Sequence, residues 1–412
     1  MESSASLELA KHTLLVFGII LATGTFSGLL ARLARVPDVV VFLLVGMLLG
    51  PGVFGLVDIK ADSAINQLIL IFGSSYILFD GGASIRLKVL KEVWITVAVI
   101  ATIGVLITAA ITGAAAYYIF GVPVIVALLL GATLASTDPA TLVPVFKQIR
   151  IKDRVAQTVM TESAFNDAMG AIITFTVLGV AMGAGEFSAG DALADLVKQA
   201  VIGIVIGGVL GYLAAFMISH ERFGFLAEYA PVVTLMAVIG AYMSADGLHS
   251  SGFMAVFVFG IMLGNQESLG FKRIYHDEAI LEDFIMTTSL IMRMFIFILL
   301  GTQVDFALMN QYLLGGVAVV TIFMLVARPA TVFLCALPDR RAKWSFKEML
   351  FMCWTRETGV IPGALAGLLL GMKAPGAQLI ASVTFIAILM TILIQATTTK
   401  WLARRLGLLV EE

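Results

Sequence analysis

The feature that most limits how this chain can fold is a succession of long apolar runs separated by short polar loops. A helix needs about 20 mostly apolar residues to cross a bilayer, and the chain offers about thirteen segments of that character. They span approximately residues 13–31, 37–50, 63–80, 92–120, 122–146, 155–182, 195–218, 229–245, 251–265, 280–301, 311–337, 346–371 and 376–402. The runs are continuous rather than alternating, which excludes a transmembrane β-barrel. We therefore predict an all-α polytopic membrane protein.

The composition excludes several other classes of protein. The chain is 60% hydrophobic and 13% charged, and its net charge of −2 provides no basic surface for nucleic acid. Cys335 and Cys353 both lie in apolar runs, so neither a disulfide framework nor a metal site is expected. The first residues are polar and acidic rather than basic, which argues against a cleaved signal peptide. No soluble regulatory domain is predicted.

Lysine and arginine are distributed unequally between alternate loops. One set of loops holds most of them, whereas the opposite set holds only Lys11, Lys60, Lys198 and Lys373. The loops of a membrane protein that carry the excess of basic residues face the cytoplasm. We therefore expect a multi-pass protein of the cell membrane with its N-terminus outside and its C-terminus in the cytoplasm.

One apolar run contains an acidic residue next to a predicted helix break. Asp138 lies in the run 122–146, together with Pro139 and Pro144. Proline lacks the backbone donor of a helix interior and clashes with the preceding turn, so the helix is expected to break near Asp138. An intramembrane acid costs about 2.5–3.5 kcal/mol on insertion scales and is rarely present without a function.

The next run, 155–182, carries a polar stripe. Its members are Glu162, Ser163, Asn166 and Asp167, and residues four apart lie above one another on a helix. A broken helix that faces a stripe of this kind is typical of a cation site. The alternative for Asp167 and Asn166 is a structural hydrogen bond between helices.

The candidate ligands follow from oxygen chemistry. We expect Asp167 to alternate between a protonated and a cation-bound form near neutral pH. The carbonyl oxygen of Thr137, freed by the break, suits a hard alkali cation, and Asp138 either assists or caps the second half-helix. Asp80, at the end of the run 63–80, is either a more distant carboxylate of the site or an interfacial cap.

Three arginines also lie inside apolar runs. A buried guanidinium needs a partner, and Glu162 is the natural partner for Arg328, which predicts a structural ion pair. For Arg293 and Arg356 we favour structural roles.

Interrupted runs recur at matching positions. The first six and last six runs could form two inverted repeats. In that case the runs 122–146 and 346–371 are each the fifth helix of their repeat. The second of these runs is interrupted by Gly359, Pro362 and Gly363. Such paired interruptions indicate the midplane site of a transporter, with the fifth and twelfth helices discontinuous and crossing.

These residues resemble the monovalent cation/proton antiporter-1 family, the sodium/proton exchanger branch of the cation–proton antiporter superfamily. The motifs that carry the resemblance are TDP at 137–139, ESAFND at 162–167 and ARP at 327–329. Two segments depart from it: Asp80 stands where many members have glutamate, and TRETGVIP at 355–362 replaces a GLRGAVP-like segment.

The resemblance implies roles for individual residues. Asp167 resembles the carboxylate that carries the cation or proton, Thr137 and Ser163 resemble oxygen ligands, and Asp138 a secondary ligand. Asn166, in place of a second aspartate, resembles the electroneutral branch, and Glu162 with Arg328 matches the family's ion bridge.

The family also implies a homodimer in which a core bundle moves against a dimerisation bundle. By range, we expect the core in residues 63–182 and 280–371. The dimerisation bundle is expected in residues 13–50, 195–265 and 376–402.

The function expected from the sequence is electroneutral exchange of one Na⁺ for one H⁺, serving pH homeostasis, with no cofactor beyond the transported ions. A K⁺/H⁺ antiporter of the same fold is the alternative. Two other classes remain open, an ion channel and an intramembrane aspartic protease, which proton-coupled flux and substrate cleavage respectively would test.

Overall fold

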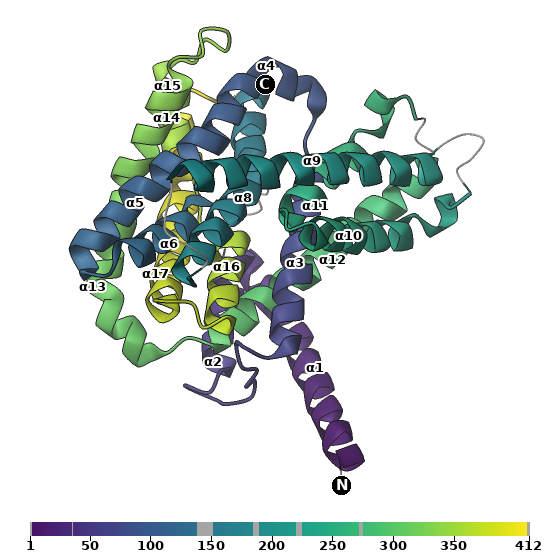
Figure 1. Cartoon of the computed structure of the whole chain (residues 1–412), viewed down its shortest axis with the longest axis vertical. Coiled ribbons are helices and arrows are strands. Elements are labelled where there is room, and N and C mark those ends of the chain that lie inside the picture. Colours follow the sequence, from purple (N-terminus) through teal and green to yellow (C-terminus); the bar gives the residue numbers. More distant parts are fainter. Residues whose placement is uncertain are drawn as a thin grey trace.

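The chain is helical almost throughout in the computed structural model, which describes residues 2–34, 36–137, 151–183, 189–219, 225–271 and 275–409 (Figure 1). Within these ranges there is no strand, and an isolated bridge pairs Ile151 with Leu409. Nine helical segments of the described residues are long and apolar enough to cross a membrane, and shorter apolar helices accompany them. The prediction of an all-α polytopic membrane protein is confirmed.

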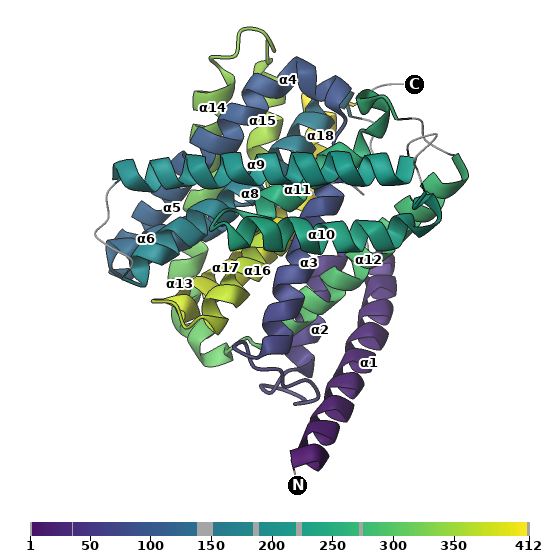
Figure 2. The ribbon, with the colours of Figure 1, turned by 45° about the vertical axis from the view of Figure 1, so that its right-hand side comes forward.

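Packing divides the helices into two bundles. The first bundle consists of α1 (Glu2–Ala34), α2 (Asp38–Leu49), α3 (Ala64–Ala83), α9 (Ala189–Ser219), α10 (Ala230–Gly247), α11 (Gly252–Gly264) and α12 (Tyr275–Thr302). The second consists of α4 (Leu87–Val99), α5 (Val105–Phe120), α6 (Val124–Ala135), α8 (Asp153–Ala181), α13 (Phe306–Ile322), α14 (Arg328–Ala336), α15 (Phe346–Trp354), α16 (Val360–Gly371), α17 (Ala377–Met390) and α18 (Thr397–Leu406). Figure 2 shows α9 and α10 running side by side and α1 leaning away from the body.

This division differs from the ranges suggested by the sequence. Helices α3 and α12 pack most extensively on α11 and α2, in the first bundle, whereas α17 packs on α13 and α16, in the second. All three helices are apolar, and hydropathy alone carries no information about which neighbour an apolar helix will contact.

Several long spans contain a π-helical turn instead of a kink. These turns are Ile100–Gly104 between α4 and α5, Phe323–Ala327 between α13 and α14, and Thr391–Ala396 between α17 and α18. Such turns insert one extra residue and are frequent near functional sites. The second turn ends immediately before Arg328, the first residue of α14.

In two places the helix ends inside a predicted run. Helix α6 ends at Ala135, a few residues before the expected break, and Ser136 has extended backbone angles. The remainder of the predicted run, residues 138–146, lies outside the described residues. The other interruption separates α15 from α16 at residues 355–359. Pro362 lies in the first turn of α16, where a missing backbone donor is tolerated.

The two bundles meet along a seam on one side of α16. Gly363 and Gly367, one turn apart, present no side chain there. A Cβ atom on Gly363 would stand 2.9 Å from a methyl group of Leu300 in α12, and one on Gly367 would stand 2.8 Å from a methyl group of Leu70 in α3. The seam is therefore formed by glycines on one bundle and flexible leucine side chains on the other.

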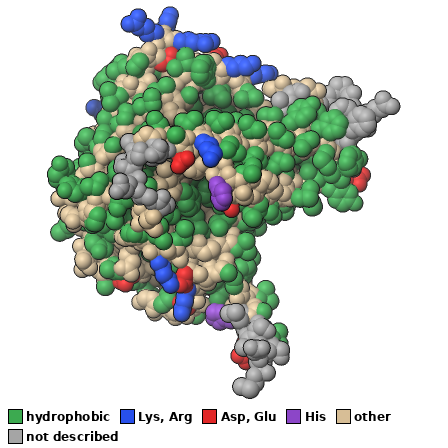
Figure 3. All heavy atoms as spheres, in the orientation of Figure 1, with side chains coloured by type: hydrophobic (Ala, Val, Ile, Leu, Met, Phe, Trp, Pro, Cys, Tyr) green, Lys and Arg blue, Asp and Glu red, His purple; other side chains and the backbone are tan. Residues whose placement is uncertain are grey.

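The surface has the character of a membrane protein. Figure 3 shows hydrophobic side chains over most of the visible face, with Lys and Arg gathered at the end of the molecule that carries the α14–α15 loop. In this loop and the first turn after it Arg340, Arg341, Lys343 and Lys347 are exposed.

A buried ion pair joins three helices of the second bundle. The Nη2 and Nη1 atoms of Arg328 in α14 donate to the two carboxylate oxygens of Glu162 in α8, at 2.8 and 3.1 Å. Nε of Arg328 donates to the carbonyl of Met352 in α15 at 2.9 Å. Both side chains are buried, at 1% and 3% exposure. Bidentate geometry and a third acceptor offset much of the cost of removing the two charges from water.

Removing one partner of this pair should destabilise the protein strongly. Glu162→Gln or Arg328→Met leaves the other charge buried without its counterion, at a cost of about 3–5 kcal/mol. The double variant should recover part of this loss. Thermal unfolding of the purified protein in detergent, followed by tryptophan fluorescence, measures the effect.

The matched control is Lys373→Met, which removes an exposed ion pair between Lys373 and Asp62 at 3.2 Å. Exposed pairs contribute little, so this variant should melt close to wild type. Single variants of Glu162 and Arg328 that melt like the Lys373 control, or a double variant with the sum of both losses, would contradict the ion-pair interpretation.

Candidate ion-binding site

The polar stripe of α8 is buried and faces the end of α6. Glu162, Ser163, Asn166 and Asp167 are each at most 4% exposed, and they occupy neighbouring positions of adjacent turns. Helix α6 ends at Ala135, which is the residue four positions before Pro139, because a proline there has no N–H for the carbonyl of Ala135 and its ring would clash with that carbonyl in a continuous helix. The last carbonyls of α6 and the hydroxyls of the following residues therefore lie against α8.

Asn166 attaches the interrupted segment to α8. Its side-chain carbonyl accepts from the backbone N–H of Thr137 at 3.0 Å, and its Nδ2 donates to Oε1 of Glu162 at 2.8 Å. A backbone N–H can only donate and an ionised carboxylate can only accept, so both ends fix the orientation of the amide. An aspartate at this position would lose the donor and place a second negative charge beside Glu162.

Three hydroxyl groups lie where the end of α6 meets the stripe of α8, and one of them binds Asp167. Ser136 Oγ donates to Asp167 Oδ1, and the hydroxyls of Thr137 and Ser163 lie 3.0 Å apart. Hydroxyls can accept as well as donate, so the same groups can turn lone pairs toward a cation held by Asp167. An ionised carboxylate with neutral oxygen ligands is the donor set that hard cations prefer.

Arg356 contacts the C-terminal end of α6. It lies in the segment between α15 and α16, where its Nη2 donates to the carbonyl of Ala135 and its Nη1 to Thr108 Oγ1 at 3.2 Å. The C-terminal carbonyls of a helix carry partial negative charge, which a guanidinium stabilises. The two interrupted spans are thus linked directly, a contact that the structural interpretation of Arg356 did not specify.

The remaining predicted residues are placed as follows. Asp80 is half-buried in the last turn of α3, and the adjacent Gly81 approaches Ala164 of α8, so this turn lies beside the helix of the stripe. Asp138 lies outside the described residues.

Two residues of the site were missed by sequence reasoning. Ser136 stands directly before the TDP motif. The signal that could have identified it is its hydroxyl group, an oxygen ligand next to that motif. Gly170 lies one turn beyond Asp167 and contacts Ser136, which no sequence pattern indicated.

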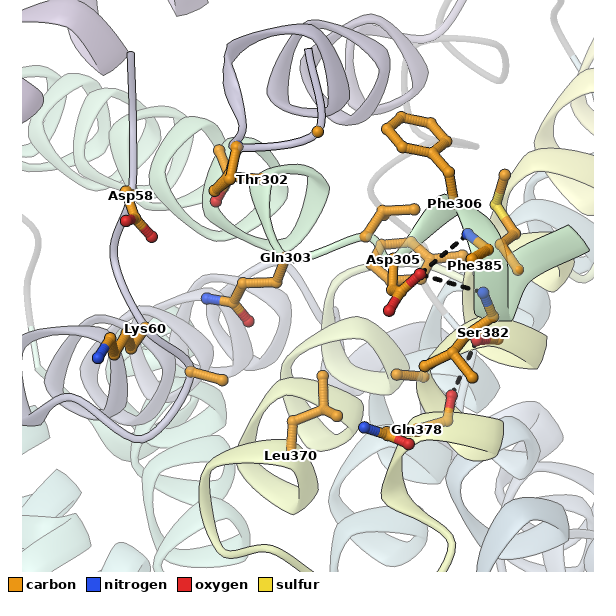
Figure 4. Close-up of a pocket in the computed structure, with 18 of the residues that line it drawn as sticks. Asp58, Lys60, Thr302, Gln303, Asp305, Phe306, Leu370, Gln378, Ser382 and Phe385 are labelled. Carbon is orange, nitrogen blue, oxygen red and sulfur yellow. Dashed lines mark hydrogen bonds between the residues drawn. The ribbon is translucent and has the colours of Figure 1, made fainter. Parts of the chain in front are cut away.

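A separate cavity of about 720 Å³ opens at the opposite end of the molecule from the α14–α15 loop. Figure 4 shows Asp58, Lys60 and Gln303 on one side of it and Gln378, Ser382 and Phe385 on the other. It is bounded by both bundles, but none of the residues that line it belongs to the stripe of α8. Its size therefore does not mark it as the ion site, since the buried acid and its oxygen partners lie elsewhere.

Comparisons with known proteins identify relatives of the chain. The chain is 34% identical to Na(+)/H(+) antiporter 1 of Methanocaldococcus jannaschii, over 85% of this chain and 81% of that protein. It is 31% identical to the K(+)/H(+) antiporter NhaP of Alkalimonas amylolytica, over 98% of this chain and 68% of that protein.

The fold is also similar to a solved structure, that of the sodium proton antiporter MjNhaP1 from Methanocaldococcus jannaschii. The TM-score is 0.79 at 30% identity, with 98% of this chain and 99% of that chain covered. Residues 18–405 match the family described as "Sodium/hydrogen exchanger, transmembrane". The resemblance inferred from the sequence is confirmed, and the chain belongs to the sodium/hydrogen exchanger family.

Proposed function

We propose that the protein is an electroneutral antiporter that exchanges one Na⁺ for one H⁺ at a site shared by the two ions. The observation that carries this proposal is the buried Asp167 of α8, which accepts from the hydroxyl of Ser136, with the paired hydroxyls of Thr137 and Ser163 at the same junction of α6 and α8. Relatives named as Na(+)/H(+) antiporters support the choice of ions. The family is one of transporters, and we propose no enzymatic reaction.

The charge balance follows from the neighbours of Asp167. Glu162 is neutralised by Arg328 at 2.8 Å, and Asn166 is neutral, so the stripe offers Asp167 as its one exchangeable carboxylate. When Asp167 releases H⁺ and binds Na⁺, the charge of the site does not change. Asp138 serves as a secondary ligand in this scheme and stays ionised.

Alternating access would move the second bundle, which carries the site, against the first. The seam at α16 and the cavity of Figure 4 both lie between the bundles, as such a motion needs. We assign the first bundle to a homodimer interface in the cell membrane. The basic end in Figure 3 faces the cytoplasm, with the N-terminus outside, and exchange serves pH homeostasis.

K⁺ is the second candidate for the exchanged cation. The relative from Alkalimonas amylolytica, which matches nearly the whole of this chain, is named as a K(+)/H(+) antiporter. Exchange measured in liposomes with Na⁺, Li⁺ and K⁺ in turn decides between these ions. Cation flux that ignores an opposing proton gradient would instead indicate a channel.

Replacing the shared carboxylate should abolish exchange. Asp167→Asn keeps the size of the side chain, but an amide neither carries the proton nor balances a cation. We expect Na⁺-driven proton flux at the level of empty liposomes, measured with a pH-sensitive dye in the lumen.

The control is Asp246→Asn at the end of α10, which removes the negative charge of an exposed carboxylate outside the stripe and should leave flux unchanged. Both variants should melt like wild type. Substantial flux through well-folded Asp167→Asn protein would show that another group carries the ions.

Exchange should not respond to an imposed membrane potential. Moving one net charge is worth about 2.3 kcal/mol per 100 mV, so an electrogenic carrier would shift its Na⁺ equilibrium strongly. The measurement is the final Na⁺ gradient in K⁺-loaded liposomes with and without valinomycin. If the gradient follows the potential instead of matching the proton gradient one to one, a second proton is exchanged and Asp138 is its most direct source.

A further inference from the structure

A glycine on α8 determines how closely the end of α6 approaches the site. Gly170 follows Asp167 by three residues and therefore lies on the same face of the helix. A Cβ atom placed on Gly170 would stand 2.8 Å from the Cβ of Ser136 and 3.3 Å from its Cα and backbone N. A separation of 2.8 Å is closer than carbon atoms pack. The absence of a side chain at 170 is thus a condition for the observed position of Ser136.

The requirement is local to this turn of the helix. Gly179 lies on the same helix, and a Cβ atom there would meet nothing within 4 Å. Helix α8 therefore tolerates an added methyl group at 179 but not at 170. Glycine also lowers helix stability relative to alanine, which makes the glycine at 170 costly unless the contact requires it.

Ser136 is held from two sides. Its Cβ rests on Gly170, and its hydroxyl donates to Oδ1 of Asp167. The side chain is fully buried, and the following residue is attached to α8 through the bond between Thr137 N–H and Asn166. The contact with Gly170 therefore sets how closely the backbone and Cβ of Ser136 approach α8, and the hydroxyl binds Asp167 from that position.

We propose that Gly170 is a positioning residue that sets the cation selectivity of the Asp167 site through Ser136. The proposal rests on the proposed antiport function. A hydroxyl held close to the carboxylate gives the short oxygen distances that a small cation needs, since selectivity between cations of one charge depends on cavity size and ligand rigidity. Displacing Ser136 enlarges the site and removes a close ligand, which weakens Na⁺ and Li⁺ binding more than K⁺ binding.

The test uses proton exchange in liposomes driven by Na⁺, Li⁺ or K⁺, with the apparent affinity measured for each cation. For Gly170→Ala we expect Na⁺ affinity to fall about tenfold, the size of effect typical for a residue that orients a ligand. The K⁺ affinity should change much less, so the Na⁺ to K⁺ ratio falls. Gly179→Ala, which adds the same methyl group to the same helix, should keep the wild-type ratio.

Two further variants separate selectivity from folding. Ser136→Ala keeps the Cβ contact with Gly170 and removes only the hydroxyl, so it should lower the same ratio even if Gly170→Ala does not fold. In Gly170→Ala with Ser136→Gly the closest contact is removed, so its melting temperature should exceed that of Gly170→Ala alone.

The outcomes distinguish the two proposals. A wild type that shows no cation-driven proton flux would overturn the antiport function and this inference with it. A wild type that exchanges, combined with unchanged cation ratios in both Gly170→Ala and Ser136→Ala, would overturn the selectivity role alone. Equal weakening of all three cations would likewise assign Gly170 a purely structural role.

Discussion

The bidentate contact between Arg328 and Glu162 is the interaction on which the rest of the site depends. In a low-dielectric interior, an acid without a counterion would be protonated or would draw in another cation. Because Arg328 holds Glu162 ionised, Glu162 can accept from Asn166, which in turn accepts from Thr137. A chain of hydrogen bonds thus connects Arg328 to the backbone of Thr137, directly after α6.

Charge neutralisation at Glu162 also explains how two acids five residues apart on α8 can have the different roles proposed for them. Glu162 is held by two guanidinium nitrogens and an amide, whereas Asp167 receives the hydroxyl of Ser136. Hydrogen bonds from charged donors are stronger than those from neutral ones, so the pair of Glu162 with Arg328 is the more firmly fixed of the two. Arg356 contributes to the site by binding the carbonyl of Ala135 at the end of α6.

The membrane class, the stripe on α8 and the family could be predicted from sequence because they depend on hydropathy, on helical spacing and on short motifs. The pairing of Glu162 with Arg328 followed from the cost of burying either charge alone. Ser136 and Gly170 could not be predicted, because their importance depends on which turn of α8 meets the end of α6. The assignment of α3, α12 and α17 to their bundles could not be predicted either. An apolar helix face can pack on any other apolar face, so the sequence does not specify which helix it contacts.

The seam at α16 has a further mechanical consequence. Gly363 and Gly367 are followed at the same interval by Gly371, and four residues of helix correspond to about 6 Å. The neighbours of the three glycines differ, because leucine methyl groups cover Gly363 and Gly367, whereas the amide of Gln67 and the carbonyl of Ala61 cover Gly371. The row therefore changes from an apolar contact to a polar one toward the C-terminal end of α16. Any relative motion of the bundles along this row would exchange an apolar neighbour for a polar one, which gives the two directions of motion different costs.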